Sequence, residues 1–288
     1  MDQLPERSKV PAFFRRPSHL IIAVVVVLAL IGGGLWWGIS RPKKCDLSVA
    51  SPRPTGIALP APAPGTSGEV DLAGWKLTLP EAGAQGTAAS RTPADSVPPW
   101  LTREDDGRFT FWAPVAGVTT PNSQHPRTEL VSMNNFQAGS SAHTLTASVA
   151  VSQAPAENQD IILGQIHGAG DISSVAFVML HYTAGAIRVV VKKQQGGTAS
   201  DKYPLLSNVP LGAWFDYTIS DTGDGNMTFS ARYGSNAQQV TVPIPEPFRN
   251  ATVRFQAGNY QQGTTCNSHD GALVTYSNLR EQPSTVPR

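Results

Sequence analysis

The chain has 288 residues, of which 40% are hydrophobic and 15% charged, so it can build one large domain with an appendage. Its 26 Gly and 24 Pro are typical of a turn-rich globular protein and argue against a disordered or coiled-coil chain. The net charge of +1 hides a basic head, residues 1–67, with eight Lys/Arg and three acids; the body keeps 14 basic and 18 acidic residues. No nucleic-acid partner is expected, because this body lacks an excess of basic residues.

The first feature along the chain is an uncharged apolar run from Leu20 to Ile39, about as long as a helix that spans a bilayer. Two arginines precede it, and two tryptophans lie near its outer end, where an aromatic belt belongs. We predict a basic cytoplasmic N-terminus at 1–18 and a transmembrane signal anchor at 19–40, with a signal peptide cleaved within the Ala/Pro-rich stretch that follows Ala58 as the alternative. The body is then extracellular, either attached to the cell membrane or secreted.

Residues 41–67 are rich in Pro and Ala and predict an extended, semi-rigid stalk. The folded main domain is expected at 68–283, followed by a C-terminal tail at 284–288. Cys45 and Cys266 are too far apart in sequence to form a metal or redox motif, and a disulfide between them remains open.

After residue 68 the sequence consists of short runs of β-branched and aromatic residues, separated by Gly, Pro, Asn and Asp. Many runs alternate with period two, and none keeps a helical period for three turns. The segment Asp221–Asn226 predicts a hairpin turn. The fold class is therefore all-β, a jelly roll or sandwich of two antiparallel sheets. The expected strands are Trp75–Leu79, Arg108–Trp112, Thr144–Val151, Ile161–Ile166, Val175–Tyr182, Ala186–Lys192, Trp214–Ser220, Met227–Tyr233, Gln239–Ile244, Thr252–Gly258 and Ala272–Leu279.

Two strand-like segments have one apolar face and one face suited to a charged sugar. Alternation puts Arg127 and Glu129 on the same face of the first segment. It puts Gln165 and His167 side by side in the second, with Ile166 directed into the core. If these strands are neighbours, they form part of a polar groove.

A third segment adds to the same groove. Arg254, Gln256, Tyr260 and Gln262 share one face if no bulge intervenes near Gly258. Strands of this kind in one sheet would line a concave surface with Arg, Gln, His and Tyr side chains. We therefore expect a groove that binds an anionic polysaccharide.

These side chains suit β-elimination from a 4-linked uronate. The C5 proton becomes acidic when the neighbouring carboxylate is neutralised, which Arg127 can do as a bidentate cation and Gln165 as an amide donor. His167 and Tyr260 can then act as the base that removes the C5 proton and the acid that protonates O4. This chemistry requires no cofactor, and the histidines show no metal-ligand spacing.

Three blocks, Arg127–Leu130, Gln165–His167 and Phe255–Gln262, resemble in order the signature blocks of the polysaccharide lyase family 7 alginate lyases. The segment Leu72–Pro80 is similar to the start of that family's domain, and the resemblance covers about residues 68–281. It implies a β-jelly roll whose concave sheet binds the polymer.

The resemblance also implies roles for the four central residues. Arg127 and Gln165 neutralise the carboxylate, His167 assists or acts as base, and Tyr260 is the acid and, for one sugar epimer, also the base. The middle residue of the second block, Ile166, is associated in the family with acceptance of guluronate.

The chain departs from the family pattern where Val131 and Gln256 replace basic residues, so the groove is expected to be less basic. We predict that Glu129 orients an arginine, with a purely structural role as the alternative. Arg188 and Lys192 share a strand face and are further candidates for substrate binding, with a solvated face as the alternative.

The leading hypothesis is a monomeric, endo-acting alginate lyase. A lyase acting on another polyuronate, such as glucuronan, is the second hypothesis. The third is a carbohydrate-binding module of the same fold without catalytic activity.

Overall fold

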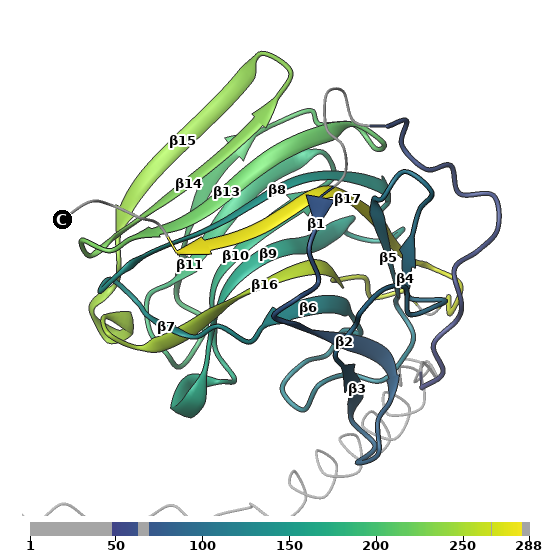
Figure 1. The fold of residues 1–288 in the computed structure, drawn as a ribbon, viewed down its shortest axis with the longest axis horizontal. Helices are drawn as coiled ribbons and strands as arrows, with labels where there is room; N and C mark the ends of the chain where they lie inside the picture. Colours follow the sequence, from purple (N-terminus) through teal and green to yellow (C-terminus); the bar gives the residue numbers. More distant parts are fainter. Residues whose placement is uncertain (1–47, 63–68, 266, 284–288) are drawn as a thin grey trace, which may run out of the picture. The chain divides into compact units, whose positions relative to one another are not determined.

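Two β-sheets dominate the fold (Figure 1). The computed structural model describes residues 48–62, 69–265 and 267–283, and these contain seventeen strands and two short 3-10 helices. The strands are β1 (Glu69–Val70), β2 (Trp75–Ala82), β3 (Ala88–Arg91), β4 (Leu101–Arg103), β5 (Phe109–Pro114), β6 (Thr128–Ser132), β7 (Phe136–Gln137), β8 (Ala142–Gln153), β9 (Asp160–Gly168), β10 (Ala176–Thr183), β11 (Ala186–Lys192), β12 (Ser200–Leu206), β13 (Trp214–Thr222), β14 (Asn226–Tyr233), β15 (Asn236–Pro243), β16 (Thr252–Gln261) and β17 (Gly271–Pro283). The 3-10 helices are η1 (Gly170–Ile172) and η2 (Glu246–Phe248).

Within the described residues, sheet A has eight strands, in the order β15-β14-β13-β8-β17-β5-β4, with β1 added beside β17. Sheet B has nine, in the order β12-β11-β10-β9-β16-β6-β2-β3, with β7 added beside β16. All pairs are antiparallel except β1 with β17. The predicted all-β class with two antiparallel sheets is confirmed, and the arrangement is consistent with a jelly-roll sandwich.

The core lies between the two sheets and follows from strand alternation. In β13 every second side chain is buried, including Phe215, Tyr217 and Ile219. On sheet B, Leu163 and Phe255 are fully buried in the same cluster. Each large apolar side chain buried in this way contributes about 1.5–3 kcal/mol, so the core stabilises a rigid support for the outer faces.

Period-two patterning located the long strands correctly. The predicted hairpin turn at Asp221–Asn226 is confirmed, since β13 and β14 pair in register across it. The pattern missed β12, an edge strand of sheet B that contains Pro204. Proline lacks the N–H of a ladder bond and is tolerated at an edge, so it obscures the strand in the sequence.

Residues 48–62, the described part of the predicted stalk, lie against the β-sandwich. Arg108 donates a hydrogen bond to the Pro60 carbonyl at 2.8 Å, and the Trp214 indole donates one to Ala61 at 2.7 Å. Nearer the start of this segment, the Trp112 indole donates a hydrogen bond to the Ser51 carbonyl at 2.9 Å. These bonds fix an extended segment that contributes part of the domain surface. The boundary at residue 68 stays a prediction.

The predicted anchor at 19–40 lies outside the described residues, as do Cys45, Cys266 and the tail at 284–288. Within the part of the chain that the structure describes, no helix has the length and apolar character to cross a membrane.

A backbone irregularity in β16 lies next to the polar groove. The pairing of β16 with β9 shifts between Ala257 and Tyr260, as the sequence allowed. Gly258 has φ +143°, and a Cβ there would lie 2.8 Å from the Thr128 carbonyl oxygen and 2.9 Å from Glu129 Cα. Glycine is therefore required where β16 approaches β6.

We expect Gly258→Ala to lower the free energy of unfolding by about 1–3 kcal/mol, because the new methyl group strains this close approach. Urea denaturation of the full chain measures the change. Gly196→Ala is the matched control, since a Cβ at Gly196 meets nothing within 4 Å. Equal stability of the two variants would contradict the strain.

Candidate active site

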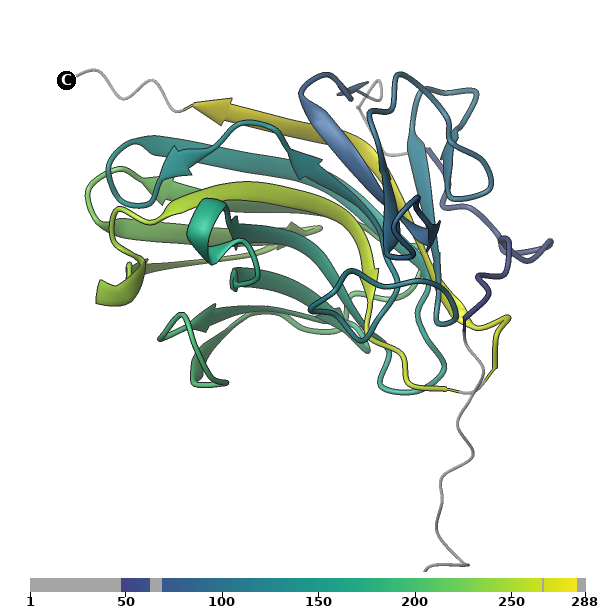
Figure 2. The ribbon, with the colours of Figure 1, turned by 90° about the horizontal axis from the view of Figure 1, so that it is seen from below.

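A cavity of about 380 Å³ lies on the face of sheet B that carries the polar side chains. Most of its lining residues come from β6, β9 and β16, with β16 between the other two strands in the sheet (Figure 1 and Figure 2), and from the loop before β6. The cavity brings together seven of the ten predicted site residues: Arg127, Glu129, Gln165, His167, Arg254, Gln256 and Tyr260.

Alternation along β6 and β9 explains why these side chains meet. Glu129 lines the cavity while its neighbour Leu130 is fully buried in the core. Gln165 and His167 line it while Ile166, between them, is buried in the core. The predicted faces of both strands are confirmed.

The Glu129 carboxylate is fully buried and holds two predicted site residues. Its Oε2 accepts a hydrogen bond from Arg127 Nη1 at 2.9 Å in an ion pair. Its Oε1 accepts one from Gln165 Nε2 at 2.5 Å. A buried carboxylate needs such partners, so Glu129 fixes the orientations of both side chains. This agrees with the expectation that Glu129 orients an arginine.

The Gln165 amide has a definite orientation. Its Nε2 donates to Glu129 and also to Gln256 Oε1 at 3.1 Å, which uses both amide hydrogens. Its Oε1 is buried and has no hydrogen-bond partner among the described residues. The Gln165 atom that remains available to the substrate is therefore Oε1, which accepts a hydrogen bond. The sequence had suggested that the amide donates to the substrate.

His167 is held as a neutral imidazole. Its Nδ1 lies 3.0 Å from the Gly168 carbonyl oxygen, which can only accept, so Nδ1 carries the proton and Nε2 keeps a lone pair. Burial lowers the pKa of His167 to about 4, helped by the positive charges of Arg127, Arg254 and Lys192 and opposed by the bond to Gly168. At neutral pH the Nε2 lone pair is therefore free to accept a proton, and the lowered pKa makes this imidazole a weaker base than an exposed histidine.

Tyr260 lies between a cation and a hydroxyl. The Arg127 guanidinium carbon is 3.4 Å from the centroid of its ring. The Tyr260 hydroxyl is 2.8 Å from the Oγ of Ser123, in the loop before β6. The sequence did not indicate Ser123, because a serine in a turn is ordinary and its partner lies 137 residues away.

Arg254 and Gln256 complete the cavity wall on β16. Burial lowers the pKa of Arg254 from its usual value, although a guanidinium remains charged at neutral pH. Val131, which replaces a basic residue of the family pattern, also lines the cavity. Arg127 and Arg254 are therefore the two arginines of this wall among the described residues.

Three predicted substrate-binding residues do not line this cavity. Arg188 pairs with Asp160 at 3.4 Å and donates to Thr183 at 2.6 Å, so its charge is already compensated. Lys192 Nζ donates to the Gly197 carbonyl at 3.3 Å. Gln262 Nε2 donates to the Tyr260 backbone carbonyl at 3.2 Å. Substrate binding by these three residues stays a prediction.

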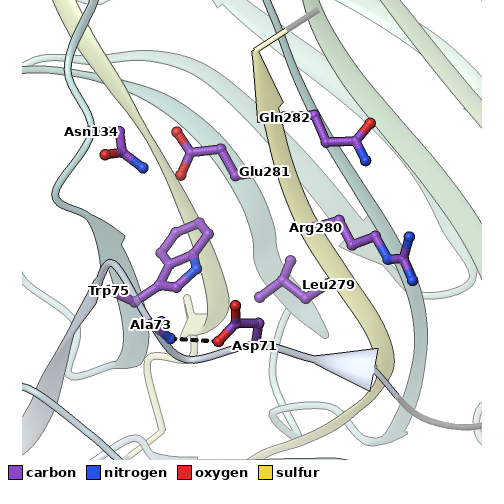
Figure 3. Close-up of a pocket in the computed structure, with 8 residues that line it drawn as sticks. All are labelled: Asp71, Ala73, Trp75, Asn134, Leu279, Arg280, Glu281 and Gln282. Atoms are coloured by element: carbon purple, nitrogen blue, oxygen red, sulfur yellow. Dashed lines mark hydrogen bonds between the residues drawn. The ribbon is translucent and has the colours of Figure 1, made fainter.

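A second hollow, beside β17, is lined by a different set of residues (Figure 3). Trp75 and Glu281 line it, together with Asp71, whose carboxylate accepts the Ala73 N–H at 2.8 Å. Glu281 accepts a hydrogen bond from Ser132 at 2.6 Å. None of the ten predicted site residues lines this hollow, so the cavity on sheet B is the candidate active site.

Comparisons with known proteins agree with this fold. A family model described as alginate lyase matches residues 70–282. Alginate lyase A1-II', a member of polysaccharide lyase family 7, is similar in structure, with TM-score 0.65 and 27% identity over 75% of this chain and 97% of that one. An alginate lyase from Pseudomonas aeruginosa gives TM-score 0.66 and 27% identity over 75% and 100%.

A variant of A1-II' in complex with a substrate designated GGMG gives TM-score 0.66 and 27% identity, covering 80% of this chain and 100% of that one. No curated protein sequence matches the chain. The fold and the family match define a polysaccharide lyase. The chain belongs to the alginate lyases of polysaccharide lyase family 7, as its three sequence blocks predicted.

Glu129→Ala is expected to lower the free energy of unfolding by about 3–5 kcal/mol, because it leaves the buried Arg127 charge without its partner. Asp201→Ala is the control, since it removes an exposed ion pair with Lys193 worth at most about 1 kcal/mol. Chemical denaturation compares them. Similar losses in the two variants would show that Glu129 is not a buried anchor.

The imidazole of His167 should titrate near pH 4 and stay neutral at pH 5 and above. An NMR titration measures this, with the signal assigned by its absence in His167→Gln. Because the nearby guanidinium of Arg254 disfavours the protonated imidazole, Arg254→Ala should move the midpoint to higher pH. A midpoint near the ordinary value of about 6.5 in the parent protein would contradict the burial of this group.

Proposed function

We propose that this lyase cleaves alginate, including guluronate-containing polymer, by endo-acting β-elimination and releases unsaturated oligouronates. The observation that carries the proposal is the single cavity in which Arg127, held by Glu129, lies beside a neutral His167 and the hydroxyl of Tyr260. These groups match the three requirements of the reaction: charge neutralisation, a base and an acid.

The uronate carboxylate binds against Arg127. With Glu129 occupying Nη1, the guanidinium keeps other N–H groups for the substrate. Its positive charge stabilises the electron density that develops on the carboxylate when the C5 proton leaves. Gln165 Oε1 supports this step as an acceptor for a substrate hydroxyl or for a proton on the carboxyl group.

The proton transfers are divided between two side chains. His167 Nε2 takes the C5 proton, and the electrons of the broken C5–H bond pass onto the uronate carboxylate as an enolate-like species. These electrons form the C4–C5 double bond as the C4–O4 bond breaks, and Tyr260 donates its phenolic proton to O4 of the leaving sugar. Atoms and charge balance without a further reactant.

Acceptance of guluronate is supported by Ile166 in the second block and by the GGMG complex of the related enzyme A1-II'. Ile166 is buried in the core and does not line the cavity. Its influence on the sugar epimer therefore acts through the position of β9, which places Gln165 and His167. For guluronate, His167 and Tyr260 would act from opposite sides of the sugar ring.

Tyr260→Phe should reduce kcat about 10²–10⁴-fold while polymer binding is retained, because it removes one proton-transfer group and keeps the ring against Arg127. The absorbance of the unsaturated product on alginate gives the rate. Tyr233→Phe, on sheet A, is the control for loss of a tyrosine hydroxyl. A Tyr260→Phe variant with parental kcat would overturn the assigned acid.

The substrate is tested with mannuronate-rich alginate, guluronate-rich alginate and glucuronan. Product from either alginate supports the proposal. Product from glucuronan alone would favour the second polyuronate, consistent with Val131 and Gln256 lowering the basicity of the groove. Analysis of product length over time distinguishes endo from exo action.

We also propose that the lyase is monomeric and lies on the outer side of the membrane. The support for this location is the apolar run from Leu20 to Ile39 in the sequence. Fractionation of cells, with the lyase detected by its activity, separates a membrane-anchored form from a secreted one.

A further inference from the structure

Ser123 is placed to control the proton of Tyr260. It lies in the loop between β5 and β6, directly after Thr120, Pro121 and Asn122, which line the cavity. Its Oγ is 2.8 Å from the Tyr260 hydroxyl.

The hydrogen bonds around Ser123 define which group donates. A serine hydroxyl has one hydrogen and two lone pairs. Ser123 donates its hydrogen to the His125 carbonyl at 2.9 Å and accepts the His125 N–H at 3.1 Å. The remaining lone pair faces Tyr260, so Tyr260 donates its phenolic hydrogen to Ser123.

We propose that Ser123 is a positioning residue that supports Tyr260 in both of its protonation states; this inference rests on the proposed role of Tyr260 as acid. In the resting enzyme Ser123 accepts the phenolic hydrogen and fixes the hydroxyl. When Tyr260 gives its proton to O4, the O–H bond of Tyr260 breaks and an O–H bond on O4 forms.

The hydroxyl of Ser123 then turns from the His125 carbonyl to the new phenolate, and its hydrogen remains on Ser123. One neutral hydrogen bond is exchanged for a charge-assisted bond, which is roughly twice as strong. The Arg127 guanidinium, 3.4 Å from the ring centroid, favours the same anion. Two groups therefore stabilise the phenolate that the reaction produces.

The loop that carries Ser123 is tied to the end of β16, the strand that carries Tyr260. His125 Nδ1 donates to the Gly263 carbonyl at 3.1 Å. Gln261 Nε2 donates to the Pro126 carbonyl at 3.3 Å. These bonds hold Ser123 at a set distance from the phenol, as a positioning group requires.

The test compares Ser123→Ala, Ser123→Thr and Ser123→Val in the full chain, with Gln124→Ala as a control on an exposed neighbour in the same loop. Ser123→Ala should lower kcat about ten- to hundredfold, the effect of one hydrogen bond to a charged group, and leave KM close to that of the parent. Ser123→Thr keeps the hydroxyl and should retain most of the activity. Ser123→Val, nearly the same shape without the hydroxyl, should behave like the alanine variant.

The pH profile separates this role from a structural one. Without the Ser123 donor the phenolate is less stable, so the alkaline limb of kcat should move to higher pH in Ser123→Ala and Ser123→Val. Full activity of Ser123→Val overturns the inference and leaves the proposed function intact. An alkaline limb that does not move in the Ser123 variants, while Tyr260→Phe loses activity, has the same consequence. Parental kcat in Tyr260→Phe would instead overturn the proposed role of Tyr260 as the acid, on which this inference rests. If the alanine variant fails to fold, the comparison of Thr with Val carries the test.

Discussion

The burial of one carboxylate, that of Glu129, is the constraint on which the active site depends. A fully buried carboxylate is costly unless charged or hydrogen-bonded partners surround it. Arg127 and Gln165 are those partners, and both are thereby oriented before any substrate arrives. The ion pair is best understood as a device for orientation, since a buried pair contributes little net stability relative to an apolar replacement.

The same constraint links the electrostatics of the cavity. Arg127 keeps its position between Glu129 and the ring of Tyr260, and its charge helps to keep His167 neutral. The Arg127 cation, which would neutralise a substrate carboxylate, therefore also keeps the His167 imidazole neutral and favours the Tyr260 phenolate. The two-sheet scaffold supplies the geometry, because β16 lies between β6 and β9 and brings together residues far apart in the chain.

Most of the site could be predicted because it follows the period-two geometry of strands. Arg127, Gln165, His167 and Tyr260 occupy alternating positions, and alternation survives the irregularity near Gly258. Local patterning cannot show which amide hydrogens of Gln165 are already used, since Glu129 and Gln256 come from other strands. It also cannot show that Asp160 neutralises Arg188, or that a turn serine reaches Tyr260, because both depend on tertiary contacts.

The most direct measurement is a crystal structure of the Tyr260→Phe variant with a uronate tetrasaccharide bound. The predicted result is a sugar carboxylate against the Arg127 guanidinium, with Glu129 still holding that side chain, and C5 of the same sugar within reach of His167 Nε2. A tetrasaccharide whose carboxylates all lie away from Arg127, or whose C5 atoms all lie beyond His167, would contradict the central role given to the Glu129–Arg127 pair.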